Sequence, residues 1–139
     1  MEHRDFLQIQ IDQLGQALSK LFSKMLGIKE DGQTSECREA ADQSLKKELG
    51  FNLDDITALS TDEFIETLRE KGLTSDSFDK LADILLLLAD EFYQTESGNE
   101  KSKNLYLKCL RIYQHLKNID SVYPFERQLK IERIKKLTS

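Results

Sequence analysis

The sequence predicts one all-α domain over residues 1–139, with five to six helices in antiparallel hairpins. Three observations favour this class. Apolar residues make up 39% of the chain, enough for a buried core, while one proline and six glycines are too few for a turn-rich β-sandwich or barrel. Apolar residues recur at helical spacing along most of the chain. Residues that typically start or stop helices separate these segments.

A long amphipathic helix is predicted at the N-terminus. Apolar residues at positions 7, 11, 14, 18, 21, 25 and 28 alternate in steps of four and three, which makes a heptad seam. The flanking positions lack opposite charges, so we expect the seam to pack against other helices of the same chain. A homodimer through this helix is the alternative. Gly27–Thr34 is predicted to be a loop, because it contains two glycines among polar residues.

The ends of the following helices are marked by capping residues. Ser60 and Glu63 have the spacing of a capping box, in which each side chain bonds the backbone N–H of the other. Thr74 is placed to cap the next helix, and Gly50 and Gly72 fit the position just after a helix. The predicted helices after the first cover residues 35–49, 61–71, 75–95, 100–117 and 124–137.

Two of these helices have unusual apolar patterns. Ile84–Ala89 is continuously apolar and covers every direction around a helix, so the helix over 75–95 is predicted to lie at the centre of the fold. The last helix is predicted to begin with Pro124, a residue favoured at the first helical position. Its apolar residues spread over too wide an arc to form one stripe.

Charge is divided unevenly along the chain. Residues 1–100 carry ten Lys and Arg against 22 Asp and Glu, a net charge of −12, whereas residues 101–139 carry ten against three, a net charge of +7. A basic C-terminal third favours a phosphate-bearing partner or an anionic membrane surface. We prefer the interpretation that the basic helices pack beside the acidic ones or dimerise against them, because nucleic-acid-binding domains are usually basic as a whole. A polyanion site would use Arg127, Lys130, Arg133, Lys135 and Lys136.

Motifs that carry chemistry are scarce. His3 and His115 have no further ligand at metal-binding spacing, and the chain has no glycine-rich phosphate loop. We therefore expect no metal, no cofactor and no enzymatic activity. Cys37 and Cys109 are expected to be buried as small apolar residues.

Three acidic pairs in the sequence are candidates for acid–base chemistry. Asp54–Asp55 and Asp62–Glu63 are explained by helix starts, where negative charge is favourable. Asp90–Glu91 lies near a helix end and is the pair that merits inspection in a pocket.

Targeting features are also scarce. The polar start does not resemble a secretory signal peptide, and the longest apolar run is far below the ~20 residues of a membrane span. A cytoplasmic protein without a membrane span is expected.

Residues 82–124 resemble a tetratricopeptide unit, in which two antiparallel helices interlock. The large, large, small, aromatic pattern of its first helix is matched by Leu85, Leu88, Ala89 and Phe92. The small, aromatic, small pattern of its second helix is matched by Ser102, Tyr106 and Cys109. The resemblance implies a tetratricopeptide-like C-terminal hairpin that binds a protein or peptide.

The whole chain is similar to a family of small, uncharacterised bacterial all-helical proteins with such a C-terminal half. The likeness lies in the N-terminal helix over Ile9–Leu26, the capping segment Leu59–Phe64 and the closing segment Phe125–Glu132. It implies the fold and no particular activity.

The function expected from these features is a non-catalytic helical module for protein interaction or self-association. Its partner would be a protein or peptide, or a second copy through the N-terminal helix. The residues expected to line a concave face are Tyr106, Arg111, Tyr113 and Lys117. The alternative is polyanion or nucleic-acid binding through the basic C-terminal helices. A third hypothesis is a small-molecule pocket around Tyr93 and His115.

Overall fold

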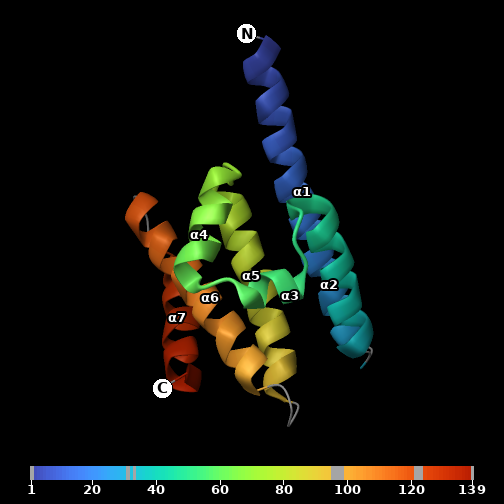
Figure 1. The fold of residues 1–139 in the computed structure, drawn as a ribbon, viewed down its shortest axis with the longest axis vertical. Helices are drawn as coiled ribbons and strands as arrows, with labels where there is room; N and C mark the ends of the chain where they lie inside the picture. The colour runs from blue at the N-terminus through green and yellow to red at the C-terminus, as the bar shows by residue number, and fades with distance from the viewer. Residues whose placement is uncertain (1, 31, 33, 95–98, 121–123, 139) are drawn as a thin grey trace.

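The computed structural model describes residues 2–30, 32, 34–94, 99–120 and 124–138, and within them it contains seven α-helices and no β-strand. In chain order they are α1 (Glu2–Glu30), α2 (Thr34–Leu49), α3 (Leu53–Ala58), α4 (Thr61–Glu70), α5 (Ser75–Tyr93), α6 (Asn99–Ile119) and α7 (Phe125–Thr138). The all-α class is confirmed, and α5 and α6 form an antiparallel hairpin (Figure 1).

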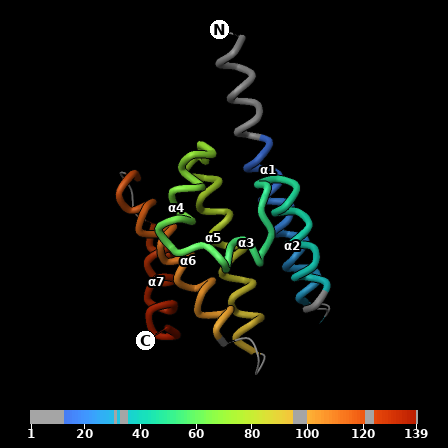
Figure 2. Tube along the Cα trace, viewed as in Figure 1, coloured from blue at the N-terminus to red at the C-terminus, as the bar shows by residue number. Residues whose placement is uncertain are grey.

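The central position predicted for α5 is confirmed. In Figure 2 the α1–α2 pair lies on one side of α5, and α6 and α7 lie on the other. Every residue from Ile84 to Ala89 is buried. Two small residues of α6 allow close packing against α5, since the Ser102 hydroxyl donates to the Ala89 carbonyl at 3.0 Å and the Cys109 thiol donates to the Ala82 carbonyl at 3.4 Å.

The helix that the sequence prediction missed is α3, so the expected number of five to six helices was too low. Its six residues are too few to show apolar periodicity. Asn52 and Asp55 nevertheless form a capping box, with N···O distances of 2.9 and 3.0 Å, and Ile56 anchors the helix in the core. Asn and Asp at this spacing were the overlooked feature, because the usual motif has Ser or Thr followed by Glu or Gln.

The predicted loop over Gly27–Thr34 was mostly wrong. Helix α1 continues through Gly27 to Glu30, and α2 begins at Thr34. A glycine inside a helix costs only about 1 kcal/mol relative to alanine, and burial of the preceding apolar residues outweighs it. Gly32, in contrast, has a φ of +77° and lies outside both helices.

The other helix ends agree closely with the capping residues. Ser60 and Glu63 form the predicted capping box, and Thr74 caps α5. Gly50 and Gly72 follow their helices with φ values of +84° and +72°. Pro124 is displaced by one position from its prediction, because α7 begins at Phe125 and the Pro124 carbonyl accepts the Gln128 N–H at 3.3 Å.

The apolar seam of α1 packs inside the chain over its described part. Leu18, Leu21 and Met25 are buried, as expected for packing against α2 and α5. Leu7 and Ile11 lie outside the side chains that the structure describes, so a homodimer through their end of the helix stays a prediction.

The two glycines near the α1–α2 junction give a paired test of this boundary. We expect Gly27→Ala to raise the free energy of unfolding by about 0.5–1 kcal/mol, because a Cβ there meets no atom within 4 Å and alanine favours a helix. Gly32→Ala should lower it by about 1 kcal/mol, because its positive φ strains any residue with a Cβ. Urea unfolding of both variants measures the two effects. Equal effects of the two substitutions would contradict the observed end of α1.

Candidate functional site

The most elaborate polar arrangement in the described structure joins α5 to α7. Asp79, Asp83 and Asp90 are spaced so that they lie along one side of α5. The facing helix carries Arg127, Lys130 and Arg133 at intervals of three, which is close to one helical turn. We call these six residues the α5–α7 ion-pair row.

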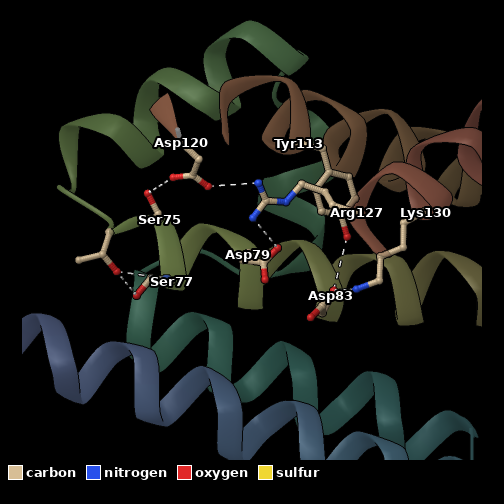
Figure 3. Close-up of polar contacts among 9 residues, drawn as sticks. Ser75, Ser77, Asp79, Asp83, Tyr113, Asp120, Arg127 and Lys130 are labelled. Carbon is tan, nitrogen blue, oxygen red and sulfur yellow. Dashed lines mark hydrogen bonds and ion pairs between the residues drawn. The ribbon is translucent and has the colours of Figure 1, made fainter. Parts of the chain in front are cut away.

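Each cation of the row binds a carboxylate, and Figure 3 shows the contacts of Arg127 and Lys130. Arg127 Nη2 lies 3.5 Å from Asp79 Oδ1, and Lys130 Nζ lies 2.8 Å from Asp83 Oδ1. Arg133 donates two hydrogen bonds to the two oxygens of Asp90, at 2.9 and 3.0 Å. Such a two-point contact fixes the guanidinium in direction as well as in distance.

Arg127 is the most buried member of the row, with 7% of its surface exposed. Besides Asp79 it binds Asp120, which follows α6, with 3.1 Å between Nη1 and Oδ2. Asp120 in turn accepts a hydrogen bond from the Ser75 hydroxyl, with 2.9 Å between the oxygens (Figure 3). One guanidinium therefore connects the start of α7 to the start of α5 and the end of α6. Burial raises the pKa of Asp79, as does the neighbouring Asp83, while Arg127 counteracts both.

Two tyrosines of α6 also bind aspartates of the ion-pair row. The Tyr106 hydroxyl donates to Asp90, and the Tyr113 hydroxyl donates to Asp83 at 3.4 Å. Burial is the first cause that raises the pKa of both hydroxyls, and the negative charge of the aspartates adds to it. Both side chains therefore remain protonated donors at neutral pH.

Helix α7 carries apolar residues on two opposite sides. Ile131 and Ile134 are buried against the body of the protein. Phe125 is 75% exposed and Leu129 is 50% exposed. These two residues are four apart and share one side, about 180° around the helix from Ile134. We call Phe125 and Leu129 the outer apolar pair. The two opposite sides explain why no single apolar stripe is visible in this part of the sequence.

The four predicted partner-binding residues differ in how far their side chains are buried. Tyr106 and Tyr113 are 1% and 0% exposed, because their aromatic rings pack into the core. A partner-binding role for these two residues stays a prediction. Arg111 is half-buried, and its Nε lies 3.5 Å from Asp62 of α4. Lys117 is exposed.

The five residues of the predicted basic cluster also differ in their surroundings. Arg127, Lys130 and Arg133 have their charges compensated by aspartates of this chain. Lys135 and Lys136 are exposed. The ion-pair row supports the interpretation that basic and acidic helices pack beside each other, whereas binding to a polyanion stays a prediction.

Asp90 and Glu91 do not act as a pair, because their side chains are directed to different helices. Asp90 belongs to the ion-pair row, whereas Glu91 is 2% exposed, and neither of its carboxylate oxygens has a hydrogen-bond partner among the described residues. Burial raises the pKa of Glu91, and the nearby Cys37 thiol of α2 and the charges of Arg38 and Lys29 only partly offset it. Burial, with the nearby Glu91, also raises the pKa of Cys37 to about 12.

The remaining candidates lie apart from one another. Cys37 and Cys109 are buried free thiols, as predicted. His115 packs against the Phe78 ring near the start of α5, with 4.8 Å between ring centroids. Tyr93 ends the same helix, about 22 Å farther along its axis. The hypothesis of one pocket around Tyr93 and His115 was therefore wrong. His3 lies outside the side chains that the structure describes.

Over the described residues, no group of three or more His, Cys, Asp or Glu side chains could hold a metal ion. None of the described helices has the length and apolar content needed to cross a membrane. The chain matches no protein-family model, no curated protein and no solved structure. The tetratricopeptide resemblance therefore stays an expectation.

Arg127 provides the first test of the ion-pair row. We expect Arg127→Met to lower the free energy of unfolding by about 2–4 kcal/mol, because it leaves Asp79 and Asp120 partly buried without their cation. Adding Asp79→Asn should restore part of the loss. The exposed control Lys135→Met should change stability by less than about 0.5 kcal/mol. Chemical unfolding of the four proteins measures this, and equal effects at positions 127 and 135 would contradict the prediction.

Glu91 provides a test by pH. Its pKa is raised in the folded state, so the folded protein takes up this proton before the unfolded chain does as the pH falls. Ionised Glu91 therefore destabilises the fold at neutral pH, and this cost disappears as the pH approaches about 4.5. We expect Glu91→Gln to raise the melting temperature at pH 7.5, with a smaller gain at pH 4.5.

The matched control for this measurement is Glu48→Gln, on the exposed side of α2. It should leave both melting temperatures nearly unchanged. A lower melting temperature of Glu91→Gln at pH 7.5 would show that the carboxylate is stabilised by Arg38 and Lys29, contrary to the prediction.

Proposed function

We propose that the protein is a non-catalytic helical module that associates with a second protein chain through the outer apolar pair of α7. The observation that carries this proposal is the exposure of Phe125 and Leu129 on the side of α7 opposite its buried side. A helix with apolar residues on two opposite sides is typical of a helix that packs against two neighbours. The described fold covers only one of these sides.

The ion-pair row is what keeps the outer apolar pair exposed. Turning α7 about its axis to bury Phe125 and Leu129 would separate Arg127, Lys130 and Arg133 from their aspartates. Isolated exposed apolar residues are common on protein surfaces. Here a phenylalanine and a leucine share one helix side whose orientation is fixed by charge, which favours a contact surface.

The simplest second chain is another copy of the same protein. The exposed residues of α7 change from acidic Glu126 near its start to basic Lys135 and Lys136 near its end. Two copies of α7 in antiparallel contact around a twofold axis would bring each acidic start toward the basic end of the other copy. This surface is thus complementary to itself. A helix of 14 residues offers a small area, so the expected association is weak.

The polyanion alternative has less support from the geometry. Three of its five cations, Arg127, Lys130 and Arg133, already bind aspartates of this chain. Strong polyanion binding usually requires several phosphate contacts, and these three cations would have to give up their aspartates to supply them. The expected concave face is also reduced, since Tyr106 and Tyr113 are buried.

Sedimentation equilibrium tests the proposal. We expect the natural protein to show a monomer–dimer equilibrium with a Kd of roughly 0.1–1 mM, as befits a small interface. The double variant Phe125→Ser, Leu129→Ser should weaken association at least about tenfold, because the removed side chains are the apolar contacts. Its melting temperature should stay near that of the natural protein, since both residues are exposed.

Leu26→Ser is the matched control, because Leu26 is an exposed leucine of α1. It should leave the dimer constant unchanged. A natural protein that stays monomeric at about 1 mM would overturn the proposal, as would equal weakening by Leu26→Ser.

A further inference from the structure

A cavity of about 300 Å³ lies between α2 and α3 on one side and α5 and α6 on the other. It is distant in sequence and structure from the outer apolar pair of α7. Leu53, Phe92 and Leu105 provide its apolar surface, and charged side chains surround them. Its volume is at the lower end of the range for small-molecule sites, which are concave and mostly apolar with a few polar groups.

Two cations meet at one wall of this cavity. The guanidinium carbon of Arg38 lies 4.4 Å from the centre of the Phe92 ring, and Lys101 Nζ lies 5.6 Å from the same centre. They come from α2 and α6, so the fold brings them together over one aromatic ring. Arg38 Nε is buried and has no hydrogen-bond acceptor among the described residues. This wall therefore presents positive charge to an anionic group, while the buried Arg38 Nε itself is out of reach of a ligand.

Carboxylates line the same cavity. Asp42 of α2 uses Oδ1 to accept the Leu53 N–H at 2.8 Å, and Asp54 of α3 is exposed. Arg38 and Asp42 are four residues apart on one helix, the spacing at which such residues commonly form an ion pair. Arg38 lies over Phe92 instead.

Opposite charges thus line one cavity without neutralising each other. Over the described residues, Arg38, Lys101, Asp42 and Asp54 form no ion pair within 4 Å, whereas the cations of the ion-pair row all do. A ligand that carries both charges would compensate the two groups at once. From this arrangement we infer that the cavity binds a small zwitterion with an apolar side chain, a free α-amino acid or a dipeptide.

The roles of the residues follow from their charges. Arg38 and Lys101 would bind the ligand carboxylate, and Asp42 and Asp54 would bind its ammonium group. Leu105 and the Phe92 ring would contact the apolar side chain. Because the cavity is small, an amino acid of leucine size is the first ligand to test.

NMR titration of the full chain with L-leucine tests the inference. We expect saturable shifts of the backbone amides around the cavity, with a Kd in the millimolar range or below. Leucinamide lacks the carboxylate and N-acetyl-leucine lacks the ammonium group, and each should bind at least about tenfold more weakly. Lys101→Gln should weaken leucine binding about three- to tenfold, since Lys101 is exposed and its loss leaves the fold intact.

Lys47→Gln is the matched control, because it removes the same charge from an exposed position of α2 that does not line the cavity. It should leave leucine binding unchanged. Three results would each overturn the inference: no amide shifts at about 20 mM leucine, equal binding of leucine and its two analogues, or equal weakening by the Lys101 and Lys47 variants. The amide spectrum of each variant shows directly whether it is folded.

Discussion

The contact of Arg127 with Asp79 and Asp120 is the interaction on which the arrangement of the C-terminal half depends. One buried guanidinium holds the starts of α5 and α7 and the end of α6 at one point. Burial of a single cation would be costly without its two carboxylates, so the three charges are stable only together. The geometry of this contact determines which side of α7 faces the core. The ion pairs of Lys130 and Arg133 farther along the helix stabilise the same orientation.

The part of the fold visible in the sequence is the part that depends on local chemistry. The capping box of Ser60 and Glu63 and the glycine after α4 act within one turn of chain, and the structure has both. The position of α5 was also predictable, because a helix that is apolar on every side requires neighbours on every side. The misjudged elements had weak or conflicting local features. A six-residue helix has too few residues for periodicity, and Gly27 lies in a helix that long-range packing stabilises.

The candidate sites were less predictable, because they depend on distances between helices. The opposite net charges of the two parts of the chain indicated that acidic and basic helices pack beside each other. They did not indicate which residues form ion pairs, such as Arg133 with Asp90. Tyr106 and Tyr113 were expected to line a concave face, and their burial follows from tertiary packing alone. The cavity lined by Arg38 and Lys101 joins residues from two helices far apart in the chain. No pattern within either helix indicates that both cations lie over Phe92.

The apolar surface of α5 also affects how the protein is made. During synthesis α5 leaves the ribosome before α6, which is its main neighbour in the fold. At that stage only α1 to α4 can cover the apolar segment of α5 from Ile84 to Ala89. Contact between α1 and α5 joins distant parts of the chain, as at Gly15 and Ser77, and such loop closure is slow compared with the pairing of α5 and α6. A nascent chain that ends before α6 thus exposes a continuous apolar surface. The helix that organises the finished fold is also the segment that most needs protection from aggregation before the fold is complete.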